Sequence, residues 1–385
     1  MLIERIIGNT NLAIDPESGN DIYLEKHVAQ KLGNNAKNLN VILEYIYRTN
    51  CSKKRLPLVC MWELTNACNF NCPFCFIHNC NTTLFQNYKD TIHLIDKMVD
   101  AGLLLCTLTG GEVLLHPEFE SIYRYMKSRG VIVEIYSNLS LLTEEHLNLF
   151  RHFKPYKIEV TLYGHDNESY HSNTNQTQYD FDCVFNNVKK LQSAGINVIC
   201  KTTATVDTYS SISQLCDLCD AEKLPYYFSF NMHPNYVGYE QKSFEVPLQI
   251  KKELLLKRAK RNGYFVDEVD KRKKAFYCSG SKYGCYISYD FRIRLCHQAY
   301  RVQNSSYPLD RTFDIEQALS FLDGFIAPYI DEKLGWCKGC SASQYCKVCG
   351  IDQMVYMQSH CQEYIKSKCV ESKALYTYVK NQING

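Results

Sequence analysis

Short apolar runs alternate with amphipathic helical patterns between residues 58 and 232, and this alternation constrains the fold more than any other feature. Strands that alternate with helices of about 10–15 residues form right-handed βαβ units, so the pattern predicts an α/β fold with a parallel sheet. In such sheets functional groups gather beyond the C-terminal ends of the strands. The predicted strands are 58–64, 103–111, 131–138, 157–164, 196–205 and 225–232, with helices between them at 91–102, 119–130 and 181–195, among others.

The segment "ELTNACNFNCPFCF" (63–76) directly follows the first predicted strand and places Cys68, Cys72 and Cys75 within eight residues. A structural zinc site uses four protein ligands. A four-iron, four-sulfur cluster normally takes one cysteine for each iron. Three cysteines therefore hold such a cluster and leave one iron open to an outside ligand. The alternative is a zinc site that another part of the chain completes.

Cys68, Cys72, Phe74 and Cys75 match the signature Cys-x3-Cys-x-aromatic-Cys, and the segment resembles the radical S-adenosylmethionine (SAM) superfamily. The resemblance implies a partial (β/α)6 TIM-like barrel. It also implies that the methionine part of SAM chelates the open iron. Reductive cleavage of SAM then gives a 5′-deoxyadenosyl radical, which abstracts hydrogen from unactivated carbon. Phe74 is expected to shield the cluster or the purine ring.

The resemblance also assigns SAM contacts to the ends of the later strands. The segment "TGGEVLLHPEF" (109–119) carries the family's Gly-Gly-Glu element, and glycine lets a backbone approach a ligand closely. Residues 172–176 depart from the family pattern, which leaves Lys201 as a substitute contact for the SAM carboxylate. An ordinary strand-end role is the alternative for Ser137, Thr161 and Lys201. The expected SAM-binding residues, besides Phe74, are Gly110, Gly111, Glu112, Ser137, Asn138, Thr161 and Lys201.

Eight further cysteines lie between residues 278 and 361, which is the number that two four-cysteine clusters need. Their spacing resembles the SPASM extension of radical SAM enzymes that modify peptides and proteins, and this implies two auxiliary [4Fe-4S] clusters, three in all. Two zinc sites are the alternative, because thiolate spacing does not name the metal. Phe291 stands where the family usually has a turn glycine, and Cys369 competes with Cys361 as the last ligand. The implied ligand sets are Cys278, Cys285, Cys296 and Cys349, and Cys337, Cys340, Cys346 and Cys361.

His297 follows Cys296 at the position where one SPASM branch carries an acidic general base. An imidazole with a pKa near 6.5 can accept a proton, so His297 is the candidate catalytic residue. A supporting or exposed histidine is the alternative. The remaining cysteines are expected to be small buried apolar side chains: Cys51, Cys60, Cys80, Cys106, Cys183, Cys200, Cys216 and Cys219.

Composition limits the surroundings and the partners of this chain of 385 residues. Its 43 basic and 41 acidic side chains give no reason to expect a nucleic-acid partner. No apolar run approaches the roughly 20 residues of a membrane span, and the N-terminus lacks a signal-peptide pattern. We therefore expect a cytoplasmic protein whose 20 cysteines bind metal more than they form disulfides. The expected units are an N-terminal extension (1–57), a radical SAM core (58–244), a charged connector (245–277) and a SPASM domain (278–385).

The leading hypothesis is a radical SAM enzyme that modifies a ribosomally made peptide, by a thioether or other crosslink or a related change. A flavodoxin or ferredoxin is the implied electron donor. Residues 1–57 look too short for a complete leader-binding winged helix, so the precursor is expected on the SPASM face, on the basic stretch 251–274 or on a separate protein. One alternative is a sulfatase-maturase-like oxidation of Cys or Ser to formylglycine. Another is a non-catalytic zinc–thiolate protein.

Overall fold

The structure is a computed structural model of the chain. It describes residues 1–19, 21–50, 55–77, 83–230, 244–262, 279–327, 340, 342, 349–351, 354–355 and 362–383. Among the cysteines predicted to bind clusters, Cys278, Cys337, Cys346 and Cys361 lie outside these residues.

A sheet of nine strands organises the molecule, in the order β12-β11-β10-β4-β5-β6-β7-β8-β9. The six strands β4 to β9 are parallel and follow one another in chain order, which confirms the α/β fold and each of the six predicted strands. The parallel strands are β4 (Val59–Glu63), β5 (Leu105–Thr109), β6 (Ile132–Ser137), β7 (Lys157–Thr161), β8 (Val198–Thr203) and β9 (Tyr226–Ser229).

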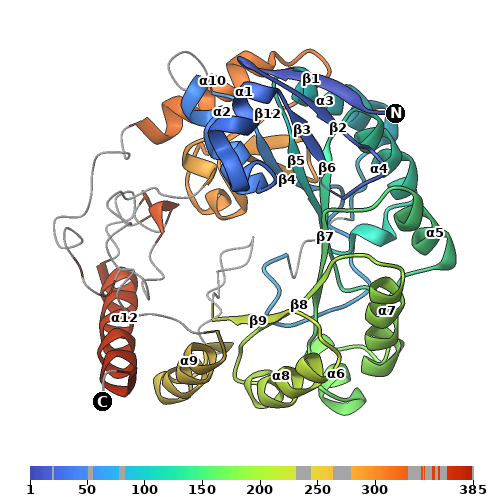
Figure 1. Ribbon diagram of the computed structural model, residues 1–385. Coiled ribbons are helices and arrows are strands. Elements are labelled where there is room, and N and C mark those ends of the chain that lie inside the picture. The colour runs from blue at the N-terminus through green and yellow to red at the C-terminus, as the bar shows by residue number, and fades with distance from the viewer. Residues whose placement is uncertain are drawn as a thin grey trace.

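Helices follow the strands in turn, and Figure 1 shows them along the outer side of the sheet. In α3, Leu94, Ile95 and Met98 recur at helical spacing and are buried against the sheet. Asn87 caps this helix by accepting a hydrogen bond from the Asp90 amide at 3.0 Å. These helices are α3 (Tyr88–Asp100), α4 (Phe119–Ser128), α5 (Glu144–His152), α6 (Asn167–Thr174), α7 (Phe181–Ser193) and α8 (Ile212–Ala221), with short 3-10 turns at Val113–Leu115 and Tyr209–Ser211.

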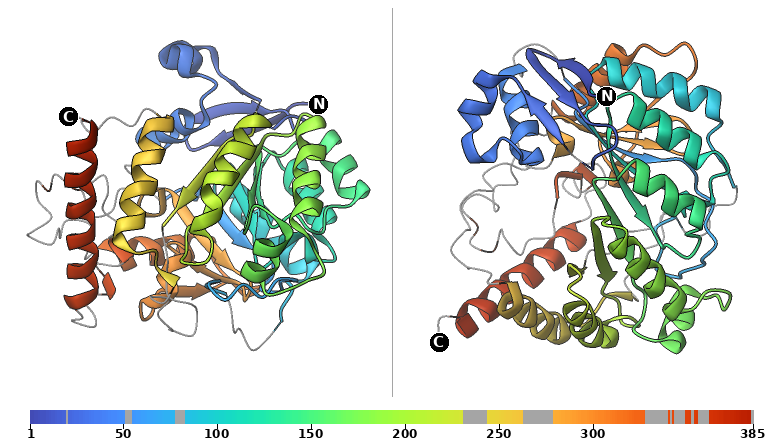
Figure 2. Two further views of the ribbon diagram at one scale, coloured as in Figure 1. Left: turned by 90° about the horizontal axis from the view of Figure 1, so that it is seen from below. Right: turned by 45° about the vertical axis from the view of Figure 1, so that its right-hand side comes forward.

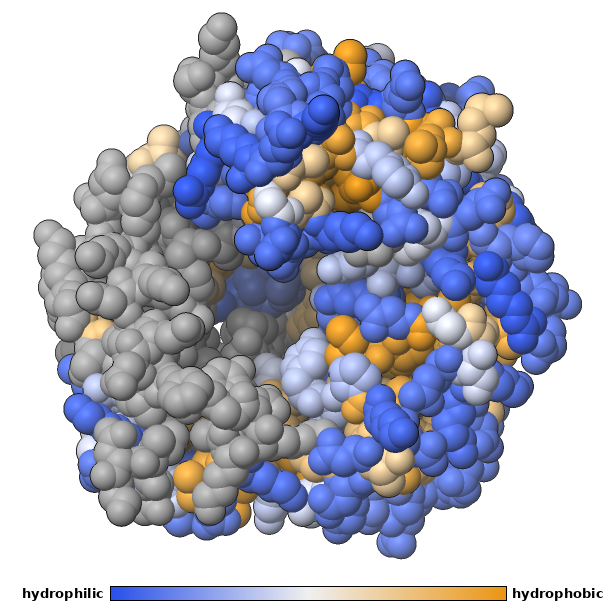
Figure 3. Space-filling model, in the orientation of Figure 1, coloured by the Kyte–Doolittle hydropathy of each residue, from blue (hydrophilic) through white to orange (hydrophobic). Residues whose placement is uncertain are grey.

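The two faces of the parallel strands differ in chemistry because successive residues of a strand point to opposite sides. The side packed against the helices is apolar and includes Trp62, Leu108 and Val160. Charged residues such as Glu134 and Glu159 occupy alternate positions of β6 and β7. The space-filling view shows a hollow near the centre of the molecule, with hydrophilic surface inside it (Figure 3).

The N-terminal residues form a small antiparallel sheet and two helices that lie beside the parallel sheet (Figure 2). Strands β2 and β3 are joined by a turn, and β1 adds the third strand on the other side of β2. Arg5 joins this unit to the core, because its buried guanidinium donates to the carbonyl oxygens of Val99 (2.8 Å), Leu103 and Gly130. The elements are β1 (Ile3–Ile7), β2 (Thr10–Ile14), β3 (Ile22–Leu24), α1 (Lys26–Leu32), a 3-10 turn (Gly33–Asn35) and α2 (Leu39–Asn50).

The C-terminal part begins within the same sheet, because β10 pairs in parallel with β4. The predicted boundary at residue 278 stays a prediction, but residues 284–308 continue the core sheet. Phe291 has a φ of 54° in the β10–β11 turn, a left-handed conformation that favours glycine. The charged connector contains a helix, α9. The elements are α9 (Leu248–Asn262), β10 (Gly284–Ser288), β11 (Arg292–Arg294), β12 (Ser306–Pro308), α10 (Ile315–Ile326), α12 (Gln362–Ile383) and 3-10 turns at Ser279–Ser281 and His297–Arg301.

Among the described helices, none is long and apolar enough to cross a membrane.

Candidate active site

The segment that carries the three cysteines, here called the cysteine loop (residues 64–77), leaves the end of β4 and packs on the Gly-Gly-Glu turn after β5. The Gly111 amide donates to the Thr65 carbonyl at 2.9 Å, and the Glu112 amide donates to the Ala67 carbonyl at 2.8 Å. A Cβ atom on Gly111 would lie 2.2 Å from the Ala67 oxygen. Only glycine permits this approach, so Gly111 serves the packing of the two loops. The predicted contact of Gly110 and Gly111 with SAM stays a prediction.

The Glu112 carboxylate connects the ends of β5 and β6. Its Oε1 accepts hydrogen bonds from the Ser137 hydroxyl at 2.7 Å and the Leu114 amide at 2.9 Å, and its Oε2 accepts one from the Asn138 amide at 2.7 Å. The side chain is fully buried, and burial raises the pKa of this carboxyl. Glu112 and Ser137 therefore hold each other in place. Their expected contacts with the SAM ammonium group and ribose stay predictions.

Asn138 extends this network to the cysteine loop. The side-chain amide of Asn138 donates to the side-chain oxygen of Asn69 at 3.0 Å. The side-chain amide of Asn69 in turn donates to the Ser140 hydroxyl at 2.8 Å. The Ser140 hydroxyl returns a bond to the Asn138 side-chain oxygen at 2.7 Å. Asn138 is 5% exposed, so its observed role is to fix the residue that follows Cys68.

Helix α6 holds the cysteine loop from the other side. The Asn71 amide donates to the Thr174 carbonyl at 3.0 Å, and the Asn173 side chain donates to the Tyr163 carbonyl. Asn175 ends the helix in a left-handed conformation. Residues 172–176, which depart from the family pattern in sequence, thus fasten the loop.

Aromatic residues precede and follow Cys72 in the cysteine loop and pack on Tyr163. Phe70 and Phe74 are each 8% exposed, and the Tyr163 ring lies 5.9 Å from Phe70 and 6.0 Å from Phe74. Burial raises the pKa of the Cys72 thiol well above its usual value. Cys75 and Cys68 raise it further, so a cationic centre is needed to hold the three as thiolates. Tyr163 lies two residues after Thr161, but no pattern in the sequence indicates where its ring points.

A cluster of charged side chains spans β6, β7 and β8. Glu159 accepts from Lys157 at 2.6 Å, from Lys201 at 3.0 Å and from the Tyr227 hydroxyl at 2.8 Å. Burial alone would raise the pKa of Glu159, but Lys201 and Lys157 lower it to about 2. Lys201 also lies 3.6 Å from the centre of the Tyr136 ring. Its ammonium is thus held by Glu159, and its predicted contact with a SAM carboxylate stays a prediction.

Thr161 ends β7 and pairs in register with Lys201. It is partly exposed, as a residue that contacts a ligand must be. Its proposed contact with SAM also stays a prediction.

The described part of the C-terminal region brings His297 to the cysteine loop. The His297 ring lies 5.7 Å from Phe76 and 6.3 Å from Tyr286. Burial lowers the pKa of His297 to about 4, so the ring is neutral at neutral pH. Its catalytic role stays a prediction.

Four of the eight C-terminal cysteines are described. Cys285 lies in β10, where its neighbour in register is Cys60 of β4. Cys296 and Cys349 both border the small apolar cluster around Leu295 and Met354. Cys340 is partly exposed. Among the described residues, no three His, Cys, Asp or Glu side chains are placed to hold a single metal ion. The cluster assignment stays a prediction.

The remaining cysteines mostly behave as expected. Five are buried, namely Cys60, Cys106, Cys200, Cys216 and Cys219. The expectation is wrong for Cys183, which is exposed because it lies near the solvent-facing N-terminal end of α7. Cys51 and Cys80 lie outside the described residues.

Comparison with known proteins connects this geometry to a family. Residues 62–220 match the family model "Radical SAM superfamily". The sporulation killing factor maturation protein SkfB of Bacillus subtilis is 28% identical over 165 residues, which span 43% of this chain and 40% of that protein. The antilisterial bacteriocin subtilosin biosynthesis protein AlbA of the same organism is 27% identical over 194 residues, or 48% of this chain and 41% of that protein. The chain therefore matches less than half the length of these two relatives.

Solved structures show the same fold over more of the chain. SuiB of Streptococcus suis, bound to S-adenosylmethionine, has a TM-score of 0.60 at 15% identity and covers 92% of this chain and 93% of its own. The protein anSMEcpe, with bound AdoMet and Kp18Cys peptide, has a TM-score of 0.60 at 12% identity, covering 83% and 99%. These likenesses concern the fold.

Proposed function

Because this chain belongs to the radical SAM superfamily, we propose that it cleaves SAM reductively and uses the resulting 5′-deoxyadenosyl radical to modify a ribosomally made peptide. The radical abstracts hydrogen from an unactivated carbon of the peptide, and the product is a thioether or other crosslink or a related change. Strands β4 to β9 with their helices form the family's partial (β/α)6 barrel, and residues 278–385 form its SPASM domain.

One observation carries the proposal. Cys68, Cys72 and Cys75 share a loop at the C-terminal end of β4, and three separate elements fasten that loop: the turn after β5, the end of β6 and helix α6. A loop held from three sides keeps its thiols in one arrangement, which a catalytic cluster requires.

The residues present fit a [4Fe-4S] cluster with one open iron. Three thiols are available on the loop, Cys68 is exposed, and the buried Tyr170 hydroxyl has no hydrogen-bond partner among the described residues. When bound, the cluster supplies the electron that cleaves SAM. We propose that Phe74 shields the cluster, and that the turn at Gly110, Gly111 and Glu112 receives the methionine ammonium group.

The strand ends provide the other proposed SAM contacts. Ser137 and Asn138 stand at the end of β6 for the ribose, Thr161 ends β7, and Lys201 is the candidate for the carboxylate. The Ser137 hydroxyl and the Asn138 backbone amide already donate hydrogen bonds to Glu112. These two residues would therefore contact SAM through their other polar atoms or lone pairs. Their first role is to position the loop.

The C-terminal cysteines are proposed to hold two auxiliary [4Fe-4S] clusters. These clusters accept the electron released on product formation or bind a substrate thiolate. In the described region, Cys296 and Cys349 lie around one apolar cluster, in agreement with their assignment to one site. His297 is the candidate general base, because its ring lies beside Phe76 of the cysteine loop. The two proposed ligand sets are those that the resemblance to the SPASM extension implies.

A peptide is the proposed substrate class because the relatives named above include a maturation protein and a bacteriocin biosynthesis protein. SuiB also has a solved structure bound to the precursor peptide SuiA, at a TM-score of 0.58 to this chain. The electron donor is proposed to be a flavodoxin or ferredoxin, and the compartment the cytoplasm. Neither a nucleic acid nor a membrane is needed for this activity.

Oxidation of a Cys or Ser to formylglycine is the second candidate, since the fold is shared with anSMEcpe, which was solved with a bound peptide. His297 argues against this candidate, because it occupies the position at which one SPASM branch carries an acidic general base. A peptide that gains a crosslink would exclude this candidate, and a peptide that gains an aldehyde would support it.

The test is to purify the chain without oxygen, measure iron and sulfide, and incubate it with dithionite and SAM. The proposal predicts about twelve irons per chain, four for each cluster, and formation of 5′-deoxyadenosine. Zinc without iron and no 5′-deoxyadenosine would contradict it and favour the zinc–thiolate alternative.

A further inference from the structure

We propose that the groove between helices α5 and α7 is the surface on which a small acidic electron-carrier protein docks in order to reduce the cluster on the cysteine loop. This inference rests on the proposed function, because reductive cleavage of SAM needs an electron from outside the chain. It goes beyond that function by giving the electron donor a place on the molecule.

The groove lies on the outer side of the sheet and has a volume of about 780 Å³. Residues of both α5 and α7 line it, and Figure 1 shows these two helices as neighbours. Among its described lining residues, three side chains are cationic, namely Arg151, Lys189 and Lys190, and one is acidic, Glu144. The whole chain carries 43 basic and 41 acidic side chains, so this excess of positive charge is local.

The cations of the groove are free to meet a partner's carboxylates. The Lys190 ammonium lies 3.8 Å from the Glu144 carboxylate, and the two side chains are 53% and 66% exposed. An exposed ion pair of this kind is weak, so a carboxylate of an approaching protein can replace Glu144. Arg151 is also exposed. A positive groove therefore attracts and orients a negatively charged protein surface.

Hydrogen bonds connect the groove to the cysteine loop. Asn187, which lines the groove and is 6% exposed, donates from its side chain to the Leu139 carbonyl at 3.1 Å. The next residue, Ser140, accepts from the Asn69 side chain at 2.8 Å, and Asn69 adjoins Cys68 in the chain. The route from Asn187 to Cys68 thus crosses two hydrogen bonds and otherwise follows covalent bonds. Electron transfer slows steeply with distance and is faster through bonds than across gaps, so this route favours reduction from the groove.

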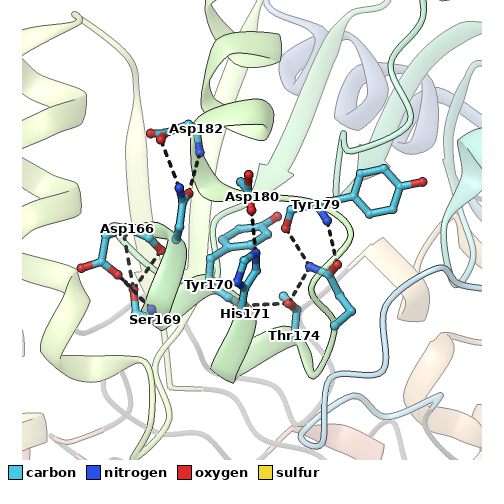
Figure 4. Close-up of polar contacts among 10 residues, drawn as sticks. Asp166, Ser169, Tyr170, His171, Thr174, Tyr179, Asp180 and Asp182 are labelled. Atoms are coloured by element: carbon cyan, nitrogen blue, oxygen red, sulfur yellow. Dashed lines mark hydrogen bonds and ion pairs between the residues drawn. The ribbon is translucent and has the colours of Figure 1, made fainter.

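The start of α7 is also fixed to helix α6, as Figure 4 shows. His171 bonds to Asp180 at 2.7 Å, and the Asp182 amide donates to the Asn167 side chain at 3.2 Å. Helix α6 in turn accepts the Asn71 amide of the cysteine loop at 3.0 Å. The wall of the groove and the cysteine loop are therefore held at a constant separation, which a docked electron carrier requires.

The transfer itself needs little contact. One electron leaves the reduced carrier, which is oxidised by one electron, and enters the cluster on the loop, which is reduced by one electron. No bond forms or breaks between the two proteins. Complexes of electron-transfer proteins bury small interfaces, below about 1,200 Å² in total, so a groove with a few charges is sufficient.

Two measurements on the full chain test the inference, with an acidic flavodoxin as the carrier. The first is the dissociation constant for oxidised flavodoxin, measured by titration calorimetry at low and at physiological salt, which needs no turnover. The second is 5′-deoxyadenosine formation with reduced flavodoxin, compared with dithionite. Dithionite is a small molecule that needs no docking surface, so it reports whether each variant keeps its fold and its cluster.

The principal variant is Arg151→Glu/Lys190→Glu, and Arg151→Gln/Lys190→Gln is a milder form that removes the charges without reversing them. The matched control is Lys31→Glu/Lys37→Glu in the N-terminal unit. It changes the net charge of the chain by the same amount as the principal variant, and both of its lysines are exposed.

We expect the dissociation constant and the KM for flavodoxin to rise about tenfold in the principal variant and about threefold in the milder one, with the difference reduced by salt. The rate with dithionite should not change, and the control variant should match the unmodified chain throughout. Equal flavodoxin affinities in the groove and control variants would overturn the inference. No flavodoxin binding by an unmodified chain that is active with dithionite would also overturn it. An unmodified chain that forms no 5′-deoxyadenosine with dithionite would instead contradict the proposed function.

Discussion

Cysteines occupy two different regions of this molecule, the cysteine loop at the end of β4 and the interior of the sheet. In the sheet, Cys60, Cys106 and Cys285 are neighbours in register across β4, β5 and β10, and all are buried. In the loop, Cys68 and Cys75 are at least partly accessible. The same residue thus fills an apolar layer where a strand is covered by helices, and becomes a candidate ligand where the strand ends. Position in the fold, more than residue type, separates packing from chemistry.

The largest effect should come from removing one cysteine of each region. Substitution of residues that support the ligands of a metal site lowers metal affinity or activity about 10–100-fold. Loss of a ligand itself should lower them further. We expect Cys68→Ala to abolish 5′-deoxyadenosine formation. Cys106→Ala, the matched change in the sheet, should keep it and lower the free energy of unfolding by about 1–2 kcal/mol. Equal activities of the two variants would remove the distinction between the regions.

Cys285 tests the distinction directly, because it lies in the sheet beside Cys60 yet is proposed to bind an auxiliary cluster. We expect Cys285→Ala to lose about four of twelve irons, since a cluster that lacks one of four cysteines is poorly held. Iron and sulfide analysis of the anaerobic protein gives the answer, with Cys60→Ala as the control. An unchanged iron content would place Cys285 among the packing cysteines.

The network that fastens the loop should matter for stability. Glu112→Gln keeps the shape of the side chain but removes a buried carboxylate that accepts three hydrogen bonds. We expect the free energy of unfolding to fall by about 3 kcal/mol. Glu118→Gln is the control, because this exposed carboxylate accepts the Tyr88 amide and should change stability by less than about 1 kcal/mol. Denaturant titrations of both variants measure the difference, and similar losses would contradict a special role for Glu112.

The smallest effect concerns the charged cluster of the sheet. The pKa of Glu159 is lowered to about 2 in the folded chain, so its contribution to stability is complete above its ordinary pKa of 4.5 and is lost as pH falls toward 2. Glu159→Gln should therefore show a weaker dependence of stability on pH between about 4.5 and 2. Denaturant midpoints measured across this range test the prediction, and the iron bound at the loop near neutral pH should not change. An unaltered pH profile would mean that Lys157 and Lys201 do not stabilise the carboxylate.

The sequence by itself determined the order of strands and helices and the place of the cysteine loop. Both depend on local pattern: alternation of apolar runs sets the parallel sheet, and a loop that follows a strand must lie at the end of that strand. The same logic placed Gly111 and Glu112 at the end of the second predicted strand. It also predicted that Cys60 and Cys106 are buried, because they lie within apolar runs.

Only the tertiary structure decided which side chains meet. Tyr163 and Tyr170 both pack against Phe70 of the cysteine loop although they lie far from it in the chain, and β10 joins β4 across more than 200 residues. Glu112 proved to bond Ser137 and Asn138, and Lys201 proved to be held by Glu159. The periodicity of a sequence fixes the face on which a residue lies, but the direction of a side chain at a strand end depends on packing among elements that are distant in the chain.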